Sequence, residues 1–236
     1  MSLDKRGTQA DRSTYRHEVE HLRQEGGPVT PTDISSARHA PLSPRMREIV
    51  DAGIEVTARG GLRGLTHRAV DAEAGLPPGS TSSYLRTRLA LTVAVTERVM
   101  AIFDESVTGL AHRLDARPLT DEQVVGEVIE LFASWLAHPA LLLARQELAA
   151  EANRHPEVAR VVCPARDTTE QLIAVMLERL GAPQPGVRAR AVLAAGEGVL
   201  SAAMSYPEDI RGDYARTVMR TIVEAFATTE RSLRAV

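Results

Sequence analysis

The stretch GLPPGSTSSYLRTR, residues Gly75 to Arg88, decides how the rest of the chain is interpreted. Two prolines, a glycine and a run of hydroxyl residues are typical of a loop. Proline nevertheless costs no hydrogen bond in the first turn of a helix, because the N–H groups there have no partner within the helix. We therefore expect Pro77 and Pro78 to begin a short helix that ends at Tyr84.

The residues before this stretch predict two more helices. Ser43 as N-cap and Pro44 at the first helical position begin an amphipathic helix that should stop at Gly60–Gly61. Thr66 is a good N-cap for a two-turn helix that ends at Gly75. A helix this short is not stable alone, so it must pack between neighbours. Two short helices joined by a turn that contains glycine are typical of a helix-turn-helix.

With these elements in place, residues 44–95 resemble the TetR family of bacterial one-component transcription regulators. The resemblance rests on residues at the helix ends and turns: Gly60, Leu65, Thr66, Ala74, Gly75, Gly79, Tyr84 and Arg88. Asp71 stands where the family commonly has alanine, and Ser82 replaces the first of two aromatic residues. The resemblance implies that the helix ending at Tyr84 is a recognition helix for the DNA major groove.

Direct reading of bases should be limited, because residues 76–85 contain no Arg, Lys, Asn or Gln. We expect Arg68 to make the main base contact. The other expected DNA contacts are phosphate clamps, hydroxyl groups and small apolar surfaces: Arg45, Thr66, His67, Pro77, Pro78, Gly79, Ser80, Thr81, Ser82, Ser83, Tyr84, Arg86 and Arg88. For each arginine, a solvated surface charge is the less favoured alternative.

The remaining sequence predicts helices and no strand. A long amphipathic run spans residues 89–114, Thr120 and Gln123 form a capping box, and Pro139, Pro156 and Pro164 mark helix starts or kinks. Residues 1–43 are poor in branched apolar residues and predict a flexible arm. We thus expect an all-α protein with this arm, a helix-turn-helix DNA-binding domain over 44–88, and a helical effector-binding and dimerisation domain over 89–236.

The last two expected helices, residues 187–205 and 209–233, carry a small-residue face and an apolar stripe. The family resemblance assigns them to a homodimer, whose two-fold axis would place two recognition helices about 34–36 Å apart on a pseudopalindromic operator. Burial of the same faces within one chain is an equal alternative on the sequence alone.

The resemblance also implies a pocket for a small-molecule effector in the second domain. Its expected lining residues are Phe103, Leu131, Trp135, Leu142, Gln146, Leu172 and Met176, each of which is also compatible with ordinary core packing. Charged residues after Leu142, among them Arg145 and Glu147, are expected to form a solvated face with salt bridges.

Several other classes of protein are disfavoured. The formal net charge is −3, although residues 44–88 carry seven arginines against five acidic residues. The lone cysteine, Cys163, cannot form a disulfide within the chain, and we find no secretory leader and no long apolar run, so we expect a cytoplasmic protein without membrane contact.

Residues 17–21, HEVEH, match the pattern of zinc proteases, but their flanks are charged and no third ligand follows. We therefore expect a solvated charged helix there, and no metal, cofactor or enzymatic activity in the chain. The sequence favours a repressor that a small molecule releases from DNA. The alternative is an all-helical dimeric binding or scaffold protein with weak or lost DNA binding.

Overall fold

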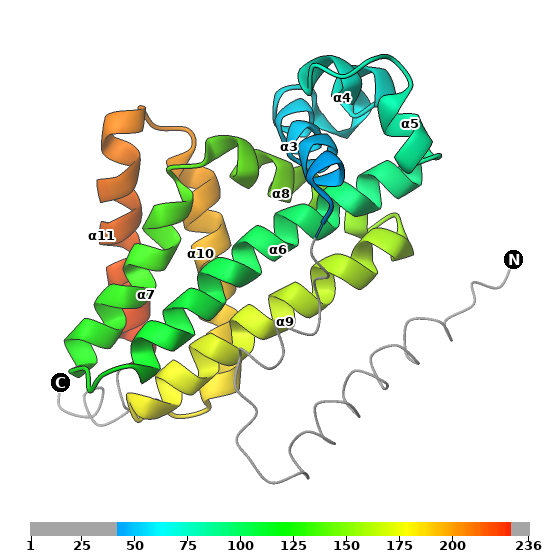
Figure 1. Ribbon diagram of the computed structural model, residues 1–236. Coiled ribbons are helices and arrows are strands. Elements are labelled where there is room, and N and C mark those ends of the chain that lie inside the picture. Colours follow the sequence, from blue (N-terminus) through cyan, green and yellow to red (C-terminus); the bar gives the residue numbers. More distant parts are fainter. Residues whose placement is uncertain (1–41, 228–236) are drawn as a thin grey trace, which may run out of the picture. The chain divides into compact units, whose positions relative to one another are not determined.

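The computed structural model describes residues 42–227, which form helices and no strand, as expected (Figure 1). Residues 1–41 of the expected arm, including HEVEH, and residues 228–233 of the last expected helix lie outside this part. The helices are α3 (Pro44–Gly64), α4 (His67–Glu73), α5 (Ser80–Tyr84), α6 (Arg88–Asp115), α7 (Asp121–Trp135), α8 (Pro139–Ala152), α9 (Pro156–Arg179), α10 (Pro185–Ala203) and α11 (Glu208–Ala227).

Helix α3 begins as predicted, because the Ser43 hydroxyl accepts a hydrogen bond from the Met46 N–H at 3.3 Å. The regular helix breaks at Gly61, where φ is 59° and ψ is −174°. This left-handed φ favours glycine, which has no Cβ to clash. The chain therefore leaves regular helix at Gly61, as predicted, and a second short helical stretch follows the kink as far as Gly64.

The two prolines do not begin α5, and that expectation is wrong. They lie in the turn before it, which the Ser80 N–H closes by donating to the Pro77 carbonyl at 3.1 Å. Gly79 has φ 91° and ψ −6°, the geometry of the third residue of a type II turn, a turn that favours proline at its second position. The prolines therefore stiffen the turn, and Gly79 separates them from the helix.

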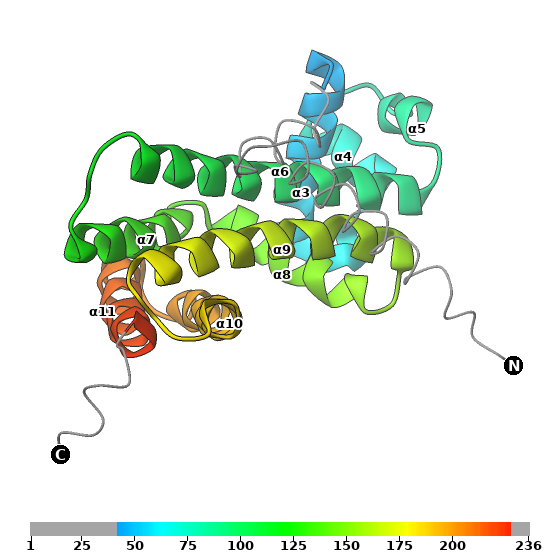
Figure 2. The same ribbon diagram turned by 90° about the horizontal axis from the view of Figure 1, so that it is seen from below.

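Helices α6 to α11 build the second part of the fold (Figures 1 and 2). The capping box at the start of α7 is confirmed in both directions: the Gln123 N–H donates to the Thr120 hydroxyl at 3.3 Å, and the Thr120 N–H donates to the Gln123 side chain at 2.9 Å. Pro139 and Pro156 begin α8 and α9, and Pro164 lies within α9. Helix α6 runs beside α9 in both views. Its first residue, Arg88, follows directly on the part formed by α3, α4 and α5, residues 44–87, which we call the recognition unit.

Helix α11 packs on α7 and α10. Met219 and Val223 of its apolar stripe are fully buried, so part of this stripe belongs to the core of one chain. Other apolar side chains of these two helices and the turn between them are open to solvent, with exposed fractions of 60% for Val187, 41% for Tyr206 and 44% for Ile210. Burial within one chain therefore accounts for only part of the apolar surface of the last helices.

No single helix among residues 42–227 has the length and apolar character needed to cross a membrane. Helices α7 and α8 meet that criterion only as a pair, with a bend of 89° between them.

Candidate nucleic-acid interface and ligand cavity

Helix α5 and the turn before it offer a small, uncharged surface. Pro77, Pro78 and Gly79 are exposed, Ser82 and Ser83 are exposed beyond them, and half of the Tyr84 surface is open at 50%. No charged residue occurs between positions 73 and 86. Such a surface allows close approach to a DNA backbone and leaves few groups that read bases.

The three serines of α5 use their hydroxyl protons within the chain. Ser80 donates to the Pro77 carbonyl at 2.6 Å, Ser82 to the Gly79 carbonyl at 2.9 Å, and Ser83 to the Ser80 carbonyl at 2.6 Å. A phosphate oxygen needs a donor, so a serine must rotate its hydroxyl before it can bind one. In the observed rotamers these serines offer only acceptor lone pairs.

The arginines around this surface fall into two groups. Within residues 42–227, Arg68 and Arg86 are exposed and make no ion pair or hydrogen bond with the protein. Arg45 pairs with Glu48 at 2.7 Å, and Arg88 donates from Nη2 to the Leu62 carbonyl at 2.5 Å. Arg68 and Arg86 are therefore the candidates whose charge is fully available to a phosphate or base.

Three other predicted contact residues have structural roles. Thr66 caps α4 by accepting from the Ala69 N–H at 3.2 Å, and His67 donates from Nε2 to the Leu85 carbonyl at 2.6 Å. Thr81 is fully buried, with none of its surface exposed. The expectation that Thr81 touches DNA is therefore wrong for this conformation, because the neighbouring helix covers its side chain.

Asp71 holds α5 against α4, a role the sequence did not suggest. Its carboxylate accepts from the Gly79 N–H at 2.8 Å and from the Thr81 N–H at 2.7 Å, and the residue is only 3% exposed. Burial alone raises the pKa of Asp71, but the hydrogen bonds from Thr81 and Gly79 outweigh it and lower that pKa below the usual value. Asp71 thus caps the N-terminus of α5 from another helix.

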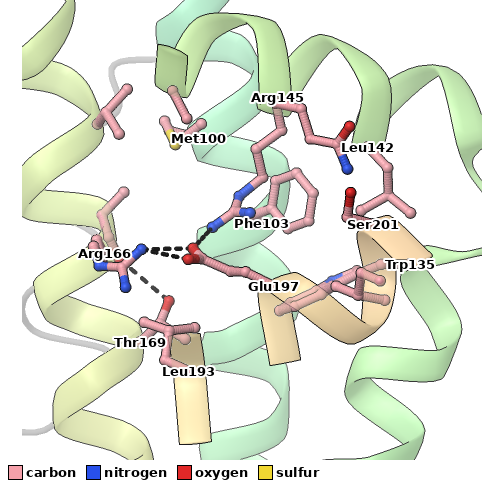
Figure 3. A pocket seen from close by; sticks show the side chains of 15 residues that line it. Met100, Phe103, Trp135, Leu142, Arg145, Arg166, Thr169, Leu193, Glu197 and Ser201 are labelled. Carbon is pink, nitrogen blue, oxygen red and sulfur yellow. Dashed lines mark hydrogen bonds and ion pairs between the residues drawn. The ribbon is translucent and has the colours of Figure 1, made fainter. Parts of the chain in front are cut away.

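A cavity of about 250 Å³ lies among the helices of the second part (Figure 3). Phe103 and Trp135 form an aromatic wall, with ring centroids 4.9 Å apart at an interplanar angle of 74°. Among the described residues, the Trp135 Nε1–H is buried and has no hydrogen-bond partner. Such an unsatisfied donor beside a cavity suits a ligand that supplies an acceptor.

Three charged side chains meet at this cavity. Glu197 accepts from Arg145 Nη2 at 2.6 Å and from Arg166 Nη1 at 2.7 and 2.6 Å. Burial raises the pKa of Glu197, yet the hydrogen bonds and charges of Arg166 and Arg145 lower it overall, so Glu197 is a carboxylate at neutral pH. Arg145 also lies over the Phe103 ring, with 5.1 Å between its guanidinium carbon and the ring centroid.

Comparison with known proteins shows what the chain is similar to. The sequence model described as "Tetracyclin repressor-like, C-terminal domain" matches residues 119–226. A solved structure described as a member of the TetR family from Streptomyces coelicolor A3 is 28% identical, covers 76% of this chain and 98% of its own, and has a TM-score of 0.61. Residues 119–226 therefore match a TetR-type C-terminal domain, and the chain is similar to a solved member of the TetR family.

Two other solved structures are similar to this chain. A transcriptional regulator from Rhodococcus sp. Rha1 shares the fold at 17% identity, with a TM-score of 0.67 over 77% of this chain and 95% of its own. The multidrug binding protein EbrR complexed with ethidium is 28% identical, with a TM-score of 0.55 over 78% of this chain and 99% of its own. No curated protein sequence matches the chain significantly.

The cavity brings together part of the predicted pocket. Phe103, Trp135, Leu142 and Gln146 line it. Leu131, Leu172 and Met176 do not, and all three are buried in the core. Apolar periodicity marks a buried position but does not tell whether empty space adjoins it.

The charged residues of the cavity were missed by the sequence reasoning. Arg145 was expected on a solvated face, but it is half-buried and pairs with Glu197, 52 positions later. Arg166 and Glu197 sit on α9 and α10 with no local motif to mark them. Only a charged residue within an otherwise apolar, small-residue run, as at Glu197, gave a hint.

Helix α8 connects the cavity to the recognition unit. Its residues Leu142, Arg145 and Gln146 line the cavity, and the next residue, Glu147, accepts from the Leu62 N–H at 3.3 Å. Leu62 directly follows the break at Gly61, and its carbonyl accepts from Arg88 of α6. The two peptide units on either side of the Leu62 Cα are therefore held by different helices, the N–H by α8 and the carbonyl by α6.

No group of three or more His, Cys, Asp or Glu side chains is placed to hold a metal ion between residues 42 and 227.

Proposed function

We propose that this chain is a transcriptional repressor of the TetR family that binds a pseudopalindromic DNA operator as a homodimer and leaves it when a small molecule enters the cavity. The observation that carries the proposal is the exposed, uncharged surface of α5, bounded by Arg68 and Arg86, whose charges no acidic residue of the described part neutralises. A short recognition helix flanked by available cations suits a major groove lined by phosphates.

The contacts to DNA divide by chemistry. Arg68, near the start of α4, is proposed to read a base edge, and Arg86 to hold a phosphate. Pro77, Pro78, Gly79 and Tyr84 supply close packing against the groove. The hydroxyls of Ser80, Ser82 and Ser83 bind phosphates after rotation. Arg45 and Arg88 add weaker contacts because each already has a partner in the protein. Thr66 and His67 act by holding the protein backbone, Thr66 at the start of α4 and His67 at the Leu85 carbonyl.

The homodimer is proposed to form through α10 and α11. Exposed apolar side chains occur near both ends of α10: Val187 in its first turn, and Tyr206 and Ile210 where the chain passes into α11. Helix α10 also presents Ala194 and Gly198 outward, and a Cβ at position 198 would meet no atom within 4 Å. Small outward residues allow a second helix to approach closely, as a two-fold helical interface requires.

The effect of the ligand is proposed to pass along α8. A ligand against Arg145 and Gln146 moves the helix that also carries Glu147, and Glu147 holds the Leu62 peptide of α3. A ligand shifts such an equilibrium only as far as it binds one conformation better than the other. The conformation that leaves the operator is therefore the one whose cavity fits the ligand better. In that conformation the two recognition helices are no longer spaced to fit one turn of DNA.

We further propose that the protein acts in the cytoplasm, without a cofactor and without enzymatic activity. The helix-turn-helix and the ligand cavity account for the exposed and buried polar groups described above without a catalytic arrangement.

Selection of bound sequences from a random DNA pool by the purified full chain tests the DNA-binding part. We expect enrichment of an inverted repeat with half-sites one helical turn apart, and an affinity that falls linearly with the logarithm of salt concentration. Arg86→Ala should weaken binding to all sequences and lower the salt slope by about 1, whereas Arg68→Ala should cost about 1–3 kcal/mol at one operator position.

The matched control is Arg179→Ala, because Arg179 is an exposed arginine that pairs with Asp115 in the second part of the fold. No enrichment, or binding that does not change with salt, would favour a scaffold protein without DNA contacts over a repressor.

A further inference from the structure

We propose that the cavity binds a small aromatic carboxylic acid, an organic anion with a flat apolar body. This inference rests on the proposed ligand-binding function and names the chemical class of the ligand. It comes from the charge, the hydrogen-bonding capacity and the shape of the side chains that line the cavity.

The charge of the lining favours an anion. Arg145, Arg166 and Glu197 are the charged side chains that line the cavity, two positive against one negative. The nearby carboxylate of Glu170 does not line the cavity and is shared between Arg166 and Arg190, at 3.5 Å from each. A ligand cation would therefore lie beside two guanidinium groups, whereas a ligand carboxylate would complete their neutralisation.

The hydrogen-bonding capacity points the same way. Both oxygens of Glu197 already accept from arginines, so this carboxylate has little capacity left for a ligand donor. A guanidinium has five N–H donors, and Arg145 uses one of them on Glu197. The Nε1–H of Trp135 has no hydrogen-bond partner among the described residues, but this atom is enclosed, so a ligand acceptor reaches it only after the ring moves. The cavity thus offers donors in excess and requires acceptors.

The shape of the lining separates the two ends of such a ligand. Arg166, Glu197 and the tip of Arg145 meet on one side of the cavity, and Phe103, Leu142 and Trp135 lie toward the other (Figure 3). The Phe103 and Trp135 rings meet edge to face, so they form an angled apolar corner rather than a flat wall. A carboxylate at the arginines would place an attached aromatic ring in this corner, against the face of one of the two rings.

Calorimetric titration of the full chain with three probes that share one ring system tests the ligand class. The probes are 2-naphthoate, the neutral 2-naphthamide and 2-naphthylmethylammonium. We expect 2-naphthoate to bind at least about tenfold more tightly than either of the others. A preference for the ammonium probe, equal affinity for all three, or no binding of 2-naphthoate at millimolar concentration would overturn the proposal.

Two substitutions locate the binding and give its sign. Glu197→Gln removes the carboxylate that competes for the arginines, so 2-naphthoate should bind severalfold more tightly; a cation site predicts the opposite. Arg166→Gln should weaken 2-naphthoate more than tenfold, and Arg166→Lys, which keeps the charge, should restore most of that loss. The control is Arg179→Gln in the exposed pair with Asp115. An unchanged affinity in both Glu197→Gln and Arg166→Gln would place the probe elsewhere and refute the site.

The probe comparison on the unaltered chain does not depend on whether a variant folds. It also contains no DNA, so it stands apart from the proposed repressor function. Binding of 2-naphthoate without release of DNA would contradict the proposed mechanism of release and leave the ligand class intact. Loss of the preference for 2-naphthoate over the other two probes would refute the ligand class and leave the proposed mechanism of release intact.

Discussion

Asp71 ties two helices of the recognition unit together through one carboxylate. Its two oxygens accept from the backbone of the turn and of α5, at 2.8 and 2.7 Å, while its own residue belongs to α4. The sequence showed only that Asp71 replaces a small residue. The capping role was not predictable, because a cap is normally read from the residue just before a helix, and this one comes from eight and ten positions earlier.

Asp71→Asn should lower the free energy of unfolding by about 1–3 kcal/mol at pH 7, since an amide supplies one oxygen acceptor where two N–H groups need one each. The pKa of Asp71 is lowered in the folded state, so its contribution is complete above the unfolded pKa and is lost as pH falls through the folded pKa. The difference between wild type and variant should therefore narrow below about pH 4.

Urea unfolding followed by circular dichroism measures this difference. Asp115→Asn, in an exposed pair with Arg179, is the control and should remain close to wild type. A difference between wild type and Asp71→Asn that is the same at pH 7 and pH 3 would mean that the charge of Asp71 contributes nothing to the cap.

At the scale of the element, the break in α3 lies at the predicted glycine pair. The Gly60–Gly61 pair correctly marked where regular helix ends, because Gly61 takes a left-handed φ of 59°. The turn after the break was not predicted, since its stability comes from Glu147 of α8 and Arg88 of α6, which hold the Leu62 peptide from outside the helix. Local sequence does not contain partners 85 and 26 positions away.

Glu147→Ala should release the Leu62 N–H, and hydrogen exchange of that amide should become about fivefold faster, the equivalent of one hydrogen bond of about 1 kcal/mol. The angle of the recognition unit should then be less well defined, so affinity for the selected operator should fall while overall unfolding changes little.

Exchange measured by mass spectrometry, together with an operator titration, checks this prediction. Glu151→Ala is the matched control on the same helix, because Glu151 pairs only locally with Arg154 and His155. If Glu147→Ala and Glu151→Ala behave alike, the link from α8 to α3 is not the route of coupling.

At the scale of the whole molecule, the helical class and the order of the main helices were predictable, because amphipathic periodicity and caps are local. The membership of the cavity was not, since three of its predicted lining residues turned out to be solid core and its charged residues come from three helices. The homodimer interface on the outward face of α10 remains a prediction.

Gly198→Glu should convert the proposed homodimer to a monomer, since it places a charge on the outward face of α10. The substitution adds a better helix former in open space, so the fold itself should not be weakened. Operator affinity should fall at least about tenfold because only one recognition helix binds at a time.

Analytical ultracentrifugation measures the oligomeric state. Val175→Glu, at an exposed apolar position of α9, is the control and should leave the assembly unchanged. A dimer that survives Gly198→Glu with full operator affinity would mean that the interface lies elsewhere.

Helix α10 lines the cavity with one face and presents small residues to solvent with the other. Its inner face supplies Leu193, Glu197 and Leu200 to the cavity, and its outer face carries Ala194 and Gly198. In the proposed dimer, only the backbone of α10 would separate each cavity from the neighbouring protomer. The first bound molecule would then alter the wall of the second cavity, so the dimer should show cooperative binding with a Hill coefficient different from 1, and the Gly198→Glu monomer should show independent sites.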